Sequence, residues 1–149
     1  MWDETMSTIA IILTSVIMSV VIGLPTGIAM SRSDRTQSIV TPILDVMQTM
    51  PPFVYLIPIV MLMGIGKIPG LIAVVIYAIP PLIRLTNLGI REVDKEALEA
   101  ADAFGATKKQ KLYQVQLPLA LPTIFAGINQ TIMMAVSYTH LTLPTNACV

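Results

Sequence analysis

The charged residues of this chain are concentrated between residues 86 and 116, and few residues suited to catalysis or metal binding accompany them. His140 and Cys148 are the only histidine and cysteine, so neither an internal disulfide nor a His/Cys metal site is available. No Ser/His or paired-Asp arrangement is present, and the phosphate-binding sequence Gly-x-x-x-x-Gly-Lys is missing. We therefore expect no catalytic residue, no metal, no cofactor and no ATP hydrolysis by this chain, and the charged segment is expected to act by binding.

The composition is that of a membrane protein. Hydrophobic residues make up 54% of the 149 positions and charged residues 12%, against roughly 25% charged residues in soluble domains. The formal net charge is zero, so no overall field favours nucleic acid as a partner. At roughly 20 residues per span, the length predicts an all-α, polytopic transmembrane helix bundle with about four spans.

Four apolar runs predict the positions of these spans. They cover residues 9–30, 46–66, 68–83 and 117–137, and the third is short enough that it borrows residues beyond Arg84. The second span is interrupted by Pro51, Pro52 and Pro58. Because the residue before a proline is pushed away from the helical conformation, we expect a kink or a break near Met50.

Basic residues are distributed asymmetrically between the loops. With four spans, the loops at residues 31–37 and 84–116 lie on the same side of the membrane, and they hold every basic residue except Lys67. Loops rich in Lys and Arg stay in the cytoplasm. The charged segment at residues 86–116 is therefore expected in the cytoplasm, and residue 1 is expected outside.

The first part of the charged segment predicts an amphipathic helix. Asp94 is the expected N-cap, with Glu96 in the first turn. At 100° per residue, the following residues fall within an arc of about 100°: Val93, Ala97, Ala100, Ala101 and Phe104. Gly105 then stands just past the helix, where a left-handed backbone is expected.

A second short helix is predicted after the bend at Gly105. Thr107 and Gln110 have the spacing of a capping box, so this helix begins near Lys108, and we expect it to end before Leu117-Pro118. Both helices are expected to lie parallel to the membrane surface. Lysines at a helix N-terminus favour an acidic partner or anionic lipid headgroups. A loop that simply packs on its own bundle is the alternative.

A few polar or small residues inside the predicted spans are candidates for a transport path or a hinge. The polar ones are Asp45, Gln48, Asn129 and Gln130. Asp45 could line a water-filled route, although an interfacial carboxylate near Arg35 is the favoured interpretation. The amides of the last span more often bond to neighbouring helices than to substrate. For residues 23–27, which hold two glycines and a proline, simple packing of small residues is favoured over a hinge or a close helix crossing.

The end of the chain departs from this arrangement. Residues 138–149 are uncharged and rich in threonine, and they begin within the predicted last span. We interpret them as a non-native or divergent tail that follows a truncation, and we interpret residues 1–137 as a partial transmembrane domain. His140 and Cys148 both lie in this tail, so neither is a candidate ligand.

The spacing inside the charged segment resembles the EAA motif of ABC importer permeases. Glu99-Ala100-Ala101 is followed after three residues by Gly105, after nine more by Val115, and then by Leu117-Pro118. The family usually has Ile where Val115 stands. The runs at 45–58, 80–86 and 129–135 are similar to the glycine betaine/proline subgroup. The resemblance covers about residues 1–137, and family members have spans before and after this region.

This resemblance implies a permease subunit of an ATP-driven importer in the bacterial inner membrane. The implied partners are a cytoplasmic ABC ATPase that receives the charged loop in a groove, an external substrate-binding protein, a second permease copy and membrane lipid. The implied ATPase-coupling residues are Glu99, Ala100, Ala101, Phe104, Gly105, Leu117 and Pro118. The implied substrate is an osmoprotectant such as glycine betaine or proline. Another small solute, such as an amino acid or another quaternary amine, is the alternative, as is a passive channel or a structural membrane protein.

Overall fold

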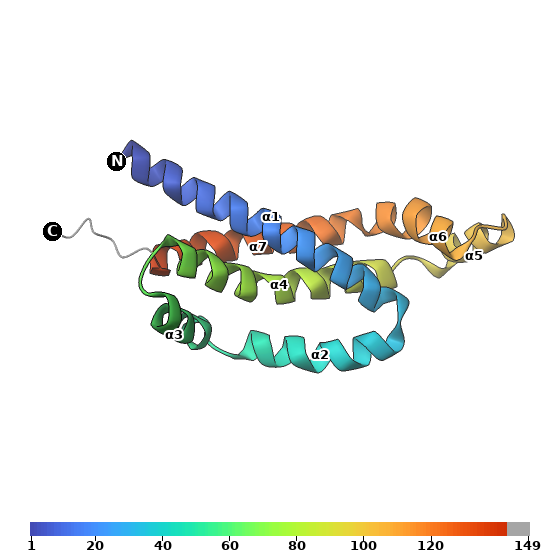
Figure 1. The fold of residues 1–149 in the computed structure, drawn as a ribbon. Coiled ribbons are helices and arrows are strands. Elements are labelled where there is room, and N and C mark those ends of the chain that lie inside the picture. Colours follow the sequence, from blue (N-terminus) through green and yellow to red (C-terminus); the bar gives the residue numbers. More distant parts are fainter. Residues whose placement is uncertain (143–149) are drawn as a thin grey trace.

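The computed structural model describes the backbone of residues 1–142 and the side chains of residues 1–138, and this part of the chain contains helices and no strand (Figure 1). The elements are α1 (Trp2–Arg32), α2 (Asp34–Thr49), α3 (Pro52–Met63), α4 (Lys67–Arg91), α5 (Lys95–Ala103), α6 (Lys108–Gln110), the π-helix η1 (Lys111–Gln116) and α7 (Leu117–Thr142). Three helices of the described part are long and apolar enough to cross a membrane, namely α1, α4 and the continuous helix Lys108–Tyr138, and the bent pair α2–α3 would be a fourth span. The expected all-α membrane bundle of about four spans is confirmed.

The helix α4 is the centre of this bundle. It packs along α1 and α7 over most of its length, and it also contacts α2 and α3. Fourteen of its 25 residues are buried. A helix that is apolar on nearly all sides is expected where other helices surround it. The other elements are therefore positioned mainly by how they pack on α4.

Glycines set the distance between α4 and its two long neighbours. A Cβ atom added to Gly27 of α1 would lie 2.6 Å from Cβ of Thr86 and 3.1 Å from the carbonyl oxygen of Ile83. A Cβ atom added to Gly127 of α7 would lie 3.2 Å from Cβ of Leu85. Small residues let membrane helices approach this closely. Residues 23–27 thus pack closely on α4 through their glycines, which agrees both with the favoured packing of small residues and with a close helix crossing.

The second predicted span differs from the structure in its shape. The helix breaks at Met50 and Pro51 as expected, but α2 and α3 meet at 86° instead of forming one kinked span over residues 46–66. The 12 residues of α3 reach only about 18 Å, which is less than the roughly 30 Å of the hydrocarbon core. The helix α3 alone therefore cannot cross the membrane.

The loop predicted at residues 31–37 is a tight turn around Ser33. The helix α2 already begins at Asp34, because the hydroxyl of Ser33 accepts a hydrogen bond from the backbone N–H of Thr36 at 3.4 Å and caps the helix. Sequence polarity pointed to a loop here, whereas the capping chemistry of Ser33 permits a helix start.

The boundaries of the last two spans also differ from the prediction. The helix α4 runs on to Arg91, so Thr86 and Asn87 are buried on a spanning helix and not in the charged loop. Two prolines, Pro80 and Pro81, stand inside α4 and do not end it, which is common for helices packed within a membrane bundle. The helix α7 passes residue 138 and continues to Thr142. Cys148 and the side chain of His140 lie outside the described residues, so the tail at 138–149 stays a prediction.

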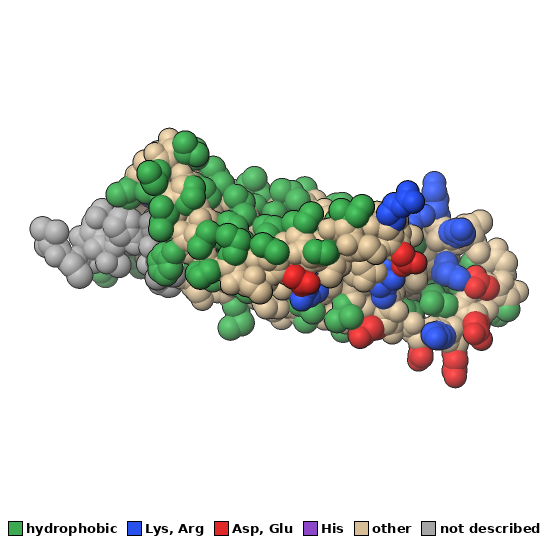
Figure 2. All heavy atoms as spheres, turned by 90° about the horizontal axis from the view of Figure 1, so that it is seen from below, with side chains coloured by type: hydrophobic (Ala, Val, Ile, Leu, Met, Phe, Trp, Pro, Cys, Tyr) green, Lys and Arg blue, Asp and Glu red, His purple; other side chains and the backbone are tan. Residues whose placement is uncertain are grey.

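Charged side chains gather at one end of the molecule. Figure 2 shows Lys, Arg, Asp and Glu crowded toward that end, while most of the remaining visible face is apolar. The α1–α2 turn and the segment between α4 and α7 lie at this end, and residue 1 lies at the opposite end (Figure 1). Basic residues mark the cytoplasmic side of membrane proteins. We therefore assign the charged end to the cytoplasm.

The close approach at Gly27 makes a testable prediction. In Gly27→Ala the added methyl group would clash with Thr86 and with the backbone of α4, so we expect a loss of about 1–3 kcal/mol in the free energy of unfolding. Gly66→Ala is the matched control, because the nearest atom to its added Cβ lies 3.8 Å away. Unfolding midpoints in detergent measure both variants, and equal midpoints would contradict the packing described here.

Candidate functional site

The segment between α4 and α7 contains a bend held by two backbone hydrogen bonds. The N–H of Gly105 donates to the carbonyl of Asp102 at 2.9 Å, and the N–H of Ala106 donates to the carbonyl of Ala101 at 3.0 Å. These are the two bonds of a Schellman motif, which ends a helix in a left-handed residue. Gly105 has φ +76°, so the predicted left-handed backbone is confirmed. We name residues 92–116 the coupling segment, after the role that the resemblance noted above implies for it.

The chain resumes its helix directly after this bend. Thr107 Oγ1 accepts from the N–H of Gln110 at 3.4 Å, and the side chain of Gln110 accepts from the N–H of Thr107 at 2.9 Å. The predicted capping box is therefore confirmed. Both side chains satisfy backbone donors that an uncapped helix start would leave free.

The second helix does not end before Leu117-Pro118, and this part of the prediction is wrong. The helix α6 passes into the π-helix η1 and then into α7 without interruption. At their junction the N–H of Leu117 donates to the carbonyl of Leu112, five residues earlier. The wider turn lies just before Pro118, where one helical hydrogen bond is missing in any case because proline has no N–H. The second arm of the coupling segment is thus the start of a spanning helix.

A salt bridge joins the two arms of the coupling segment. Both carboxylate oxygens of Asp102 lie 2.5 Å from Nζ of Lys111. The side chain of Lys111 is 23% exposed and that of Asp102 is 59% exposed, so solvent screens the pair and its contribution to stability is small. Its geometric effect is to hold α5 against η1 on the far side of the bend.

The coupling segment also packs on the end of the bundle through an apolar cluster. Val93 and Leu112 are buried together with Ile90 of α4, Ala120 and Ile124 of α7, and Leu98 and Leu117 pack against them. Side chains from α4, α5, η1 and α7 therefore meet in one small core. The coupling segment is attached to the bundle through this core.

The residues Ala97, Ala100, Ala101 and Phe104 lie on one arc of α5 and its C-cap, but this arc is not buried as a whole. Ala101 is buried and Ala97 half-buried, whereas Ala100 and Phe104 are exposed. The predicted arc was counted from Val93, but the helix begins only at Lys95, so Val93 is out of register with it. The inner face consists instead of Ala97, Leu98 and Ala101.

The outward surface of α5 combines one large apolar side chain with charges. Phe104 is 92% exposed, and Glu99, five residues earlier, is also exposed. The lysines at 108 and 109 are exposed at the start of the second arm. Asp94 stands at the N-cap position of α5 without a capping side-chain hydrogen bond. Such a surface can bind a protein through an apolar knob flanked by both signs of charge.

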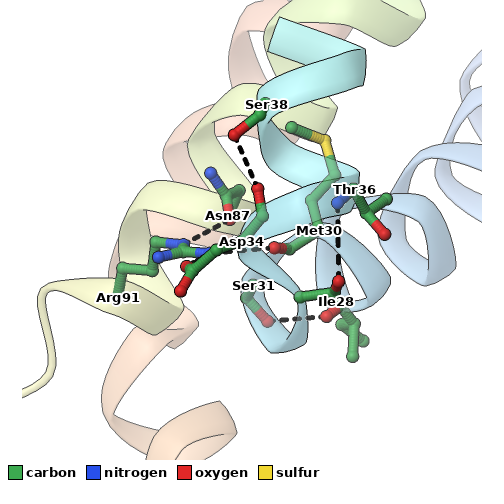
Figure 3. A network of polar contacts seen from close by, with 9 residues as sticks. Ile28, Met30, Ser31, Asp34, Thr36, Ser38, Asn87 and Arg91 are labelled. Carbon is green, nitrogen blue, oxygen red and sulfur yellow. Dashed lines mark hydrogen bonds and ion pairs between the residues drawn. The ribbon is translucent and has the colours of Figure 1, made fainter.

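Arg91 forms a polar network that sequence reasoning missed (Figure 3). Its guanidinium donates to Oδ1 of Asn87 and to the carbonyl oxygen of Met30, each at 3.1 Å, and it lies 2.9 Å from a carboxylate oxygen of Asp34. The network joins the ends of α1, α2 and α4. The i, i+4 spacing of Asn87 and Arg91 is a sequence signal, but nothing in the sequence indicates the contact with Met30.

The candidate path residues lie on two separate elements. Asp45 of α2 is exposed and forms a salt bridge with Arg84 of α4, not with Arg35, so the predicted neighbour of Asp45 is wrong. Gln48, one turn later on α2, is half-buried. On α7, Asn129 and Gln130 are exposed, and neither has a hydrogen bond to a neighbouring helix among the described residues. The favoured interpretation of these two amides as links between helices therefore stays a prediction.

The sequence from residue 19 to residue 143 matches the family described as binding-protein-dependent transport system inner membrane component. This match covers most of the chain. The chain belongs to this family. Membership confirms the resemblance to importer permeases and agrees with a transport component of the inner membrane. Among the residues that the structure describes, no three His, Cys, Asp or Glu side chains are gathered in a way that could hold a metal ion.

Individual relatives agree with this assignment. The glycine betaine/proline betaine transport system permease protein ProW of Salmonella typhimurium is 55% identical over 91% of this chain, and the glycine betaine transport system permease protein OpuAB of Bacillus subtilis is 55% identical over the same share. The chain spans 38% and 48% of the lengths of these two relatives, less than half in each case.

A solved structure of the MetNI methionine ABC transporter, in an inward-facing conformation, shares the fold. Its matching chain has a TM-score of 0.80 and 24% identity, over 95% of this chain and 73% of the other. At this level of identity the likeness concerns the fold. It supports the arrangement of helices around α4 described above.

The bend at Gly105 makes a second testable prediction. At Gly105 an added Cβ atom would meet no atom within 4 Å, so the expected effect of Gly105→Leu is the cost of a left-handed non-glycine residue, about 1–2 kcal/mol. This corresponds to roughly tenfold faster hydrogen exchange at the N–H of Ala106.

Gly105→Asn is the control for this substitution, because asparagine tolerates the left-handed conformation better than other residues. Exchange at the N–H of Leu98 on α5 reports whether the whole helix opens. Equal exchange at Ala106 in the Leu and Asn variants would rule out a backbone role for Gly105.

Proposed function

We propose that this chain is the membrane-spanning permease part of an ATP-driven importer for osmoprotectants such as glycine betaine or proline betaine. In this proposal a cytoplasmic ABC ATPase binds the coupling segment, an external substrate-binding protein delivers the solute, and two copies of the permease form the path. Family membership and the names of relatives that share 55% of aligned residues support the proposal.

The observation that carries the proposal is that hydrogen bonds and a salt bridge hold the coupling segment in one shape. A Schellman bend, a capping box and the salt bridge from Asp102 to Lys111 fix its shape. Its second arm continues into α7. A body of this kind transmits a displacement to the bundle, whereas a flexible loop absorbs it. A passive channel or a structural membrane protein has no need for such a segment.

The residues proposed to contact the ATPase follow from exposure. Phe104 and Ala100 face outward with Glu99 and are proposed to enter a groove of the ATPase, where Phe104 is the anchor. Ala101 is proposed to support this surface without touching the ATPase. Its side chain is buried, and its carbonyl accepts the hydrogen bond from the N–H of Ala106 that closes the bend. Gly105 is proposed to set the angle of this surface.

The last two residues of the motif are proposed to act at the base of the second arm. Leu117 packs against the apolar cluster at the end of the bundle. Pro118 follows the wide turn of η1. Together they connect the coupling segment to α7 and not to the ATPase.

Phe104 provides the direct test of this function. In the full-length permease, Phe104→Ala removes the exposed anchor, and we expect the Kd for the ATPase to rise roughly thirtyfold, the effect of losing about 2 kcal/mol at an interface anchor. ATP-dependent uptake of glycine betaine into vesicles should fall with it.

Tyr113→Ala is the matched control for Phe104→Ala, because Tyr113 is an aromatic residue of η1 that is 61% exposed and lies outside the proposed contact. ATPase affinity that is unchanged in Phe104→Ala, or equally reduced in both variants, would argue against this docking surface. Uptake of another small solute with no uptake of glycine betaine would support the alternative substrate classes.

The solute path is proposed to run along polar groups at membrane depth. A charged pair such as Asp45–Arg84 is unfavourable against lipid, and its exposure is consistent with water or a second copy beside α2. Gln48 belongs to the same side of the proposed path. Asn129 and Gln130 lie on the outward face of α7, and they are proposed to meet the path where the two permease copies face each other.

Accessibility to a water-soluble thiol reagent tests the path. In a Cys148→Ser background, Asn129→Cys is expected to react with a charged methanethiosulfonate, because a residue lining a path meets water. Ile17→Cys on α1 is the control, since Ile17 is 61% exposed on a face expected to meet lipid. Labelling of both positions at the same slow rate would exclude Asn129 from an aqueous path.

A further inference from the structure

The cytoplasmic corner of the molecule brings together three helix ends that the proposed function has not yet used. The helix α1 ends at Arg32, α2 begins at Asp34 and α4 ends at Arg91, immediately before the coupling segment. Figure 3 shows the side chain of Arg91 reaching from α4 into the turn between α1 and α2. We name the turn formed by residues 30–34 the α1–α2 corner.

The contacts of Arg91 match the electrostatics of all three helix ends. The carbonyl of Met30 is one of the last four of α1, which have no partner inside their own helix, and a cation beside a helix C-terminus is stabilised by the helix dipole. Arg91 supplies this cation with a hydrogen bond at 3.1 Å. Asp34 in the first turn of α2 supplies the anion, 2.9 Å from the same guanidinium nitrogen, Nη2.

Asn87 orients this guanidinium. Its Oδ1 accepts from Nε of Arg91 at 3.1 Å, and Asn87 is only 7% exposed, so its own position is set by packing. The planar guanidinium can bond to Asn87 through one nitrogen and to the corner through another, which the single nitrogen of a lysine does in a less fixed geometry.

An apolar cluster beneath the network joins the same three helices. Met30 of α1, Leu44 of α2 and Ile83 of α4 are buried against one another, with Val40 and Ile79 beside them. The side chain of Met30 thus packs in this cluster while its carbonyl accepts from Arg91. The cluster opposes separation of the helices, and the directional bonds of Arg91 oppose sliding of the α1–α2 corner past the end of α4.

We propose that Arg91 is a positioning residue that makes the α1–α2 corner move together with the coupling segment. A displacement applied to α5 reaches the end of α4 through Glu92–Asp94, and Arg91 passes it to α1 and α2 through Met30 and Asp34. The inference rests on the proposed function, because it assigns Arg91 a part in transmitting force from the ATPase. It adds a second route into the bundle beside the direct continuation into α7.

The test compares substitutions of Arg91 in the full-length permease reconstituted with its ATPase. For Arg91→Gln we expect solute transported per ATP hydrolysed to fall fivefold or more, the lower end of the usual range for coupling between two sites. Arg91→Lys should recover part of this ratio, because it keeps the charge near Met30 and Asp34. Arg35→Gln is the control, since Arg35 is exposed near the same corner and its side chain has no hydrogen bond or ion pair among the described residues.

A distance measurement on the permease without its ATPase provides an independent readout. Spin labels at Ser38 of α2 and Ala103 of α5, both exposed positions, report how the corner sits relative to the coupling segment. We expect a narrow distance distribution in the wild-type background and in Arg35→Gln, and a clearly broader one in Arg91→Gln. This readout does not depend on transport.

The outcomes separate the two proposals. Equal distance distributions in Arg91→Gln and Arg35→Gln, or equal transport ratios, would overturn the role of Arg91. Wild-type permease that takes up no solute with ATP would overturn the proposed function, while a broadened distribution in Arg91→Gln would still support the positioning role of Arg91. If Arg91→Gln does not fold, both measurements are made on Arg91→Lys instead. A wild-type ratio of solute transported per ATP hydrolysed together with a wild-type distance distribution in Arg91→Lys would then overturn the inference.

Discussion

The close packing of α1 and α7 on α4 is the constraint on which the rest of the structure depends. Helices in a membrane gain little from hiding apolar surface from lipid, so their association relies on close contact. Glycines at 23 and 27 of α1 and at 127 of α7 let both helices approach α4 so closely that an added Cβ atom would lie 2.8, 2.6 and 3.2 Å from its nearest neighbour, respectively. The central helix therefore carries the coupling segment at one end and receives α1 and α7 along its length, and a displacement at that end acts on a tightly packed body.

The coupling segment obtains its shape from hydrogen bonds to the backbone that can form at an exposed site. The bend at Gly105 satisfies the carbonyls at the end of α5, and the capping box satisfies the donors at the start of α6. Neither device requires burial, so the segment can expose Phe104 and remain ordered. The apolar cluster around Leu112 then attaches it to α4 and α7. The exposure and the rigidity that the proposed function requires are thus provided by different parts of the same 25 residues.

Two acidic residues of α2, Asp34 and Asp45, form salt bridges at different positions along the helix. At the cytoplasmic end, Asp34 belongs to a network with Arg91 that ties three helix ends together. Further along the helix, Asp45 pairs with Arg84 in a region that should otherwise meet lipid, which is consistent with the proposed path. The helix then breaks at Met50, and α3 turns away at 86°. In the proposed function, α2 would therefore connect the α1–α2 corner, which moves together with the coupling segment, to polar groups beside the proposed solute path.

The amino-acid sequence by itself determined the features that depend on neighbouring residues. The left-handed Gly105, the capping box of Thr107 and Gln110, the break at Met50 and the membrane composition all follow from local backbone chemistry and hydropathy. Only the tertiary structure decided that Ala101 faces inward, that Asp45 pairs with Arg84, that the second arm continues into α7 and that Arg91 bonds to Met30, 61 residues away. These contacts depend on the rotation and depth of whole helices. Packing against α4 sets both, and no periodicity within a single helix encodes them.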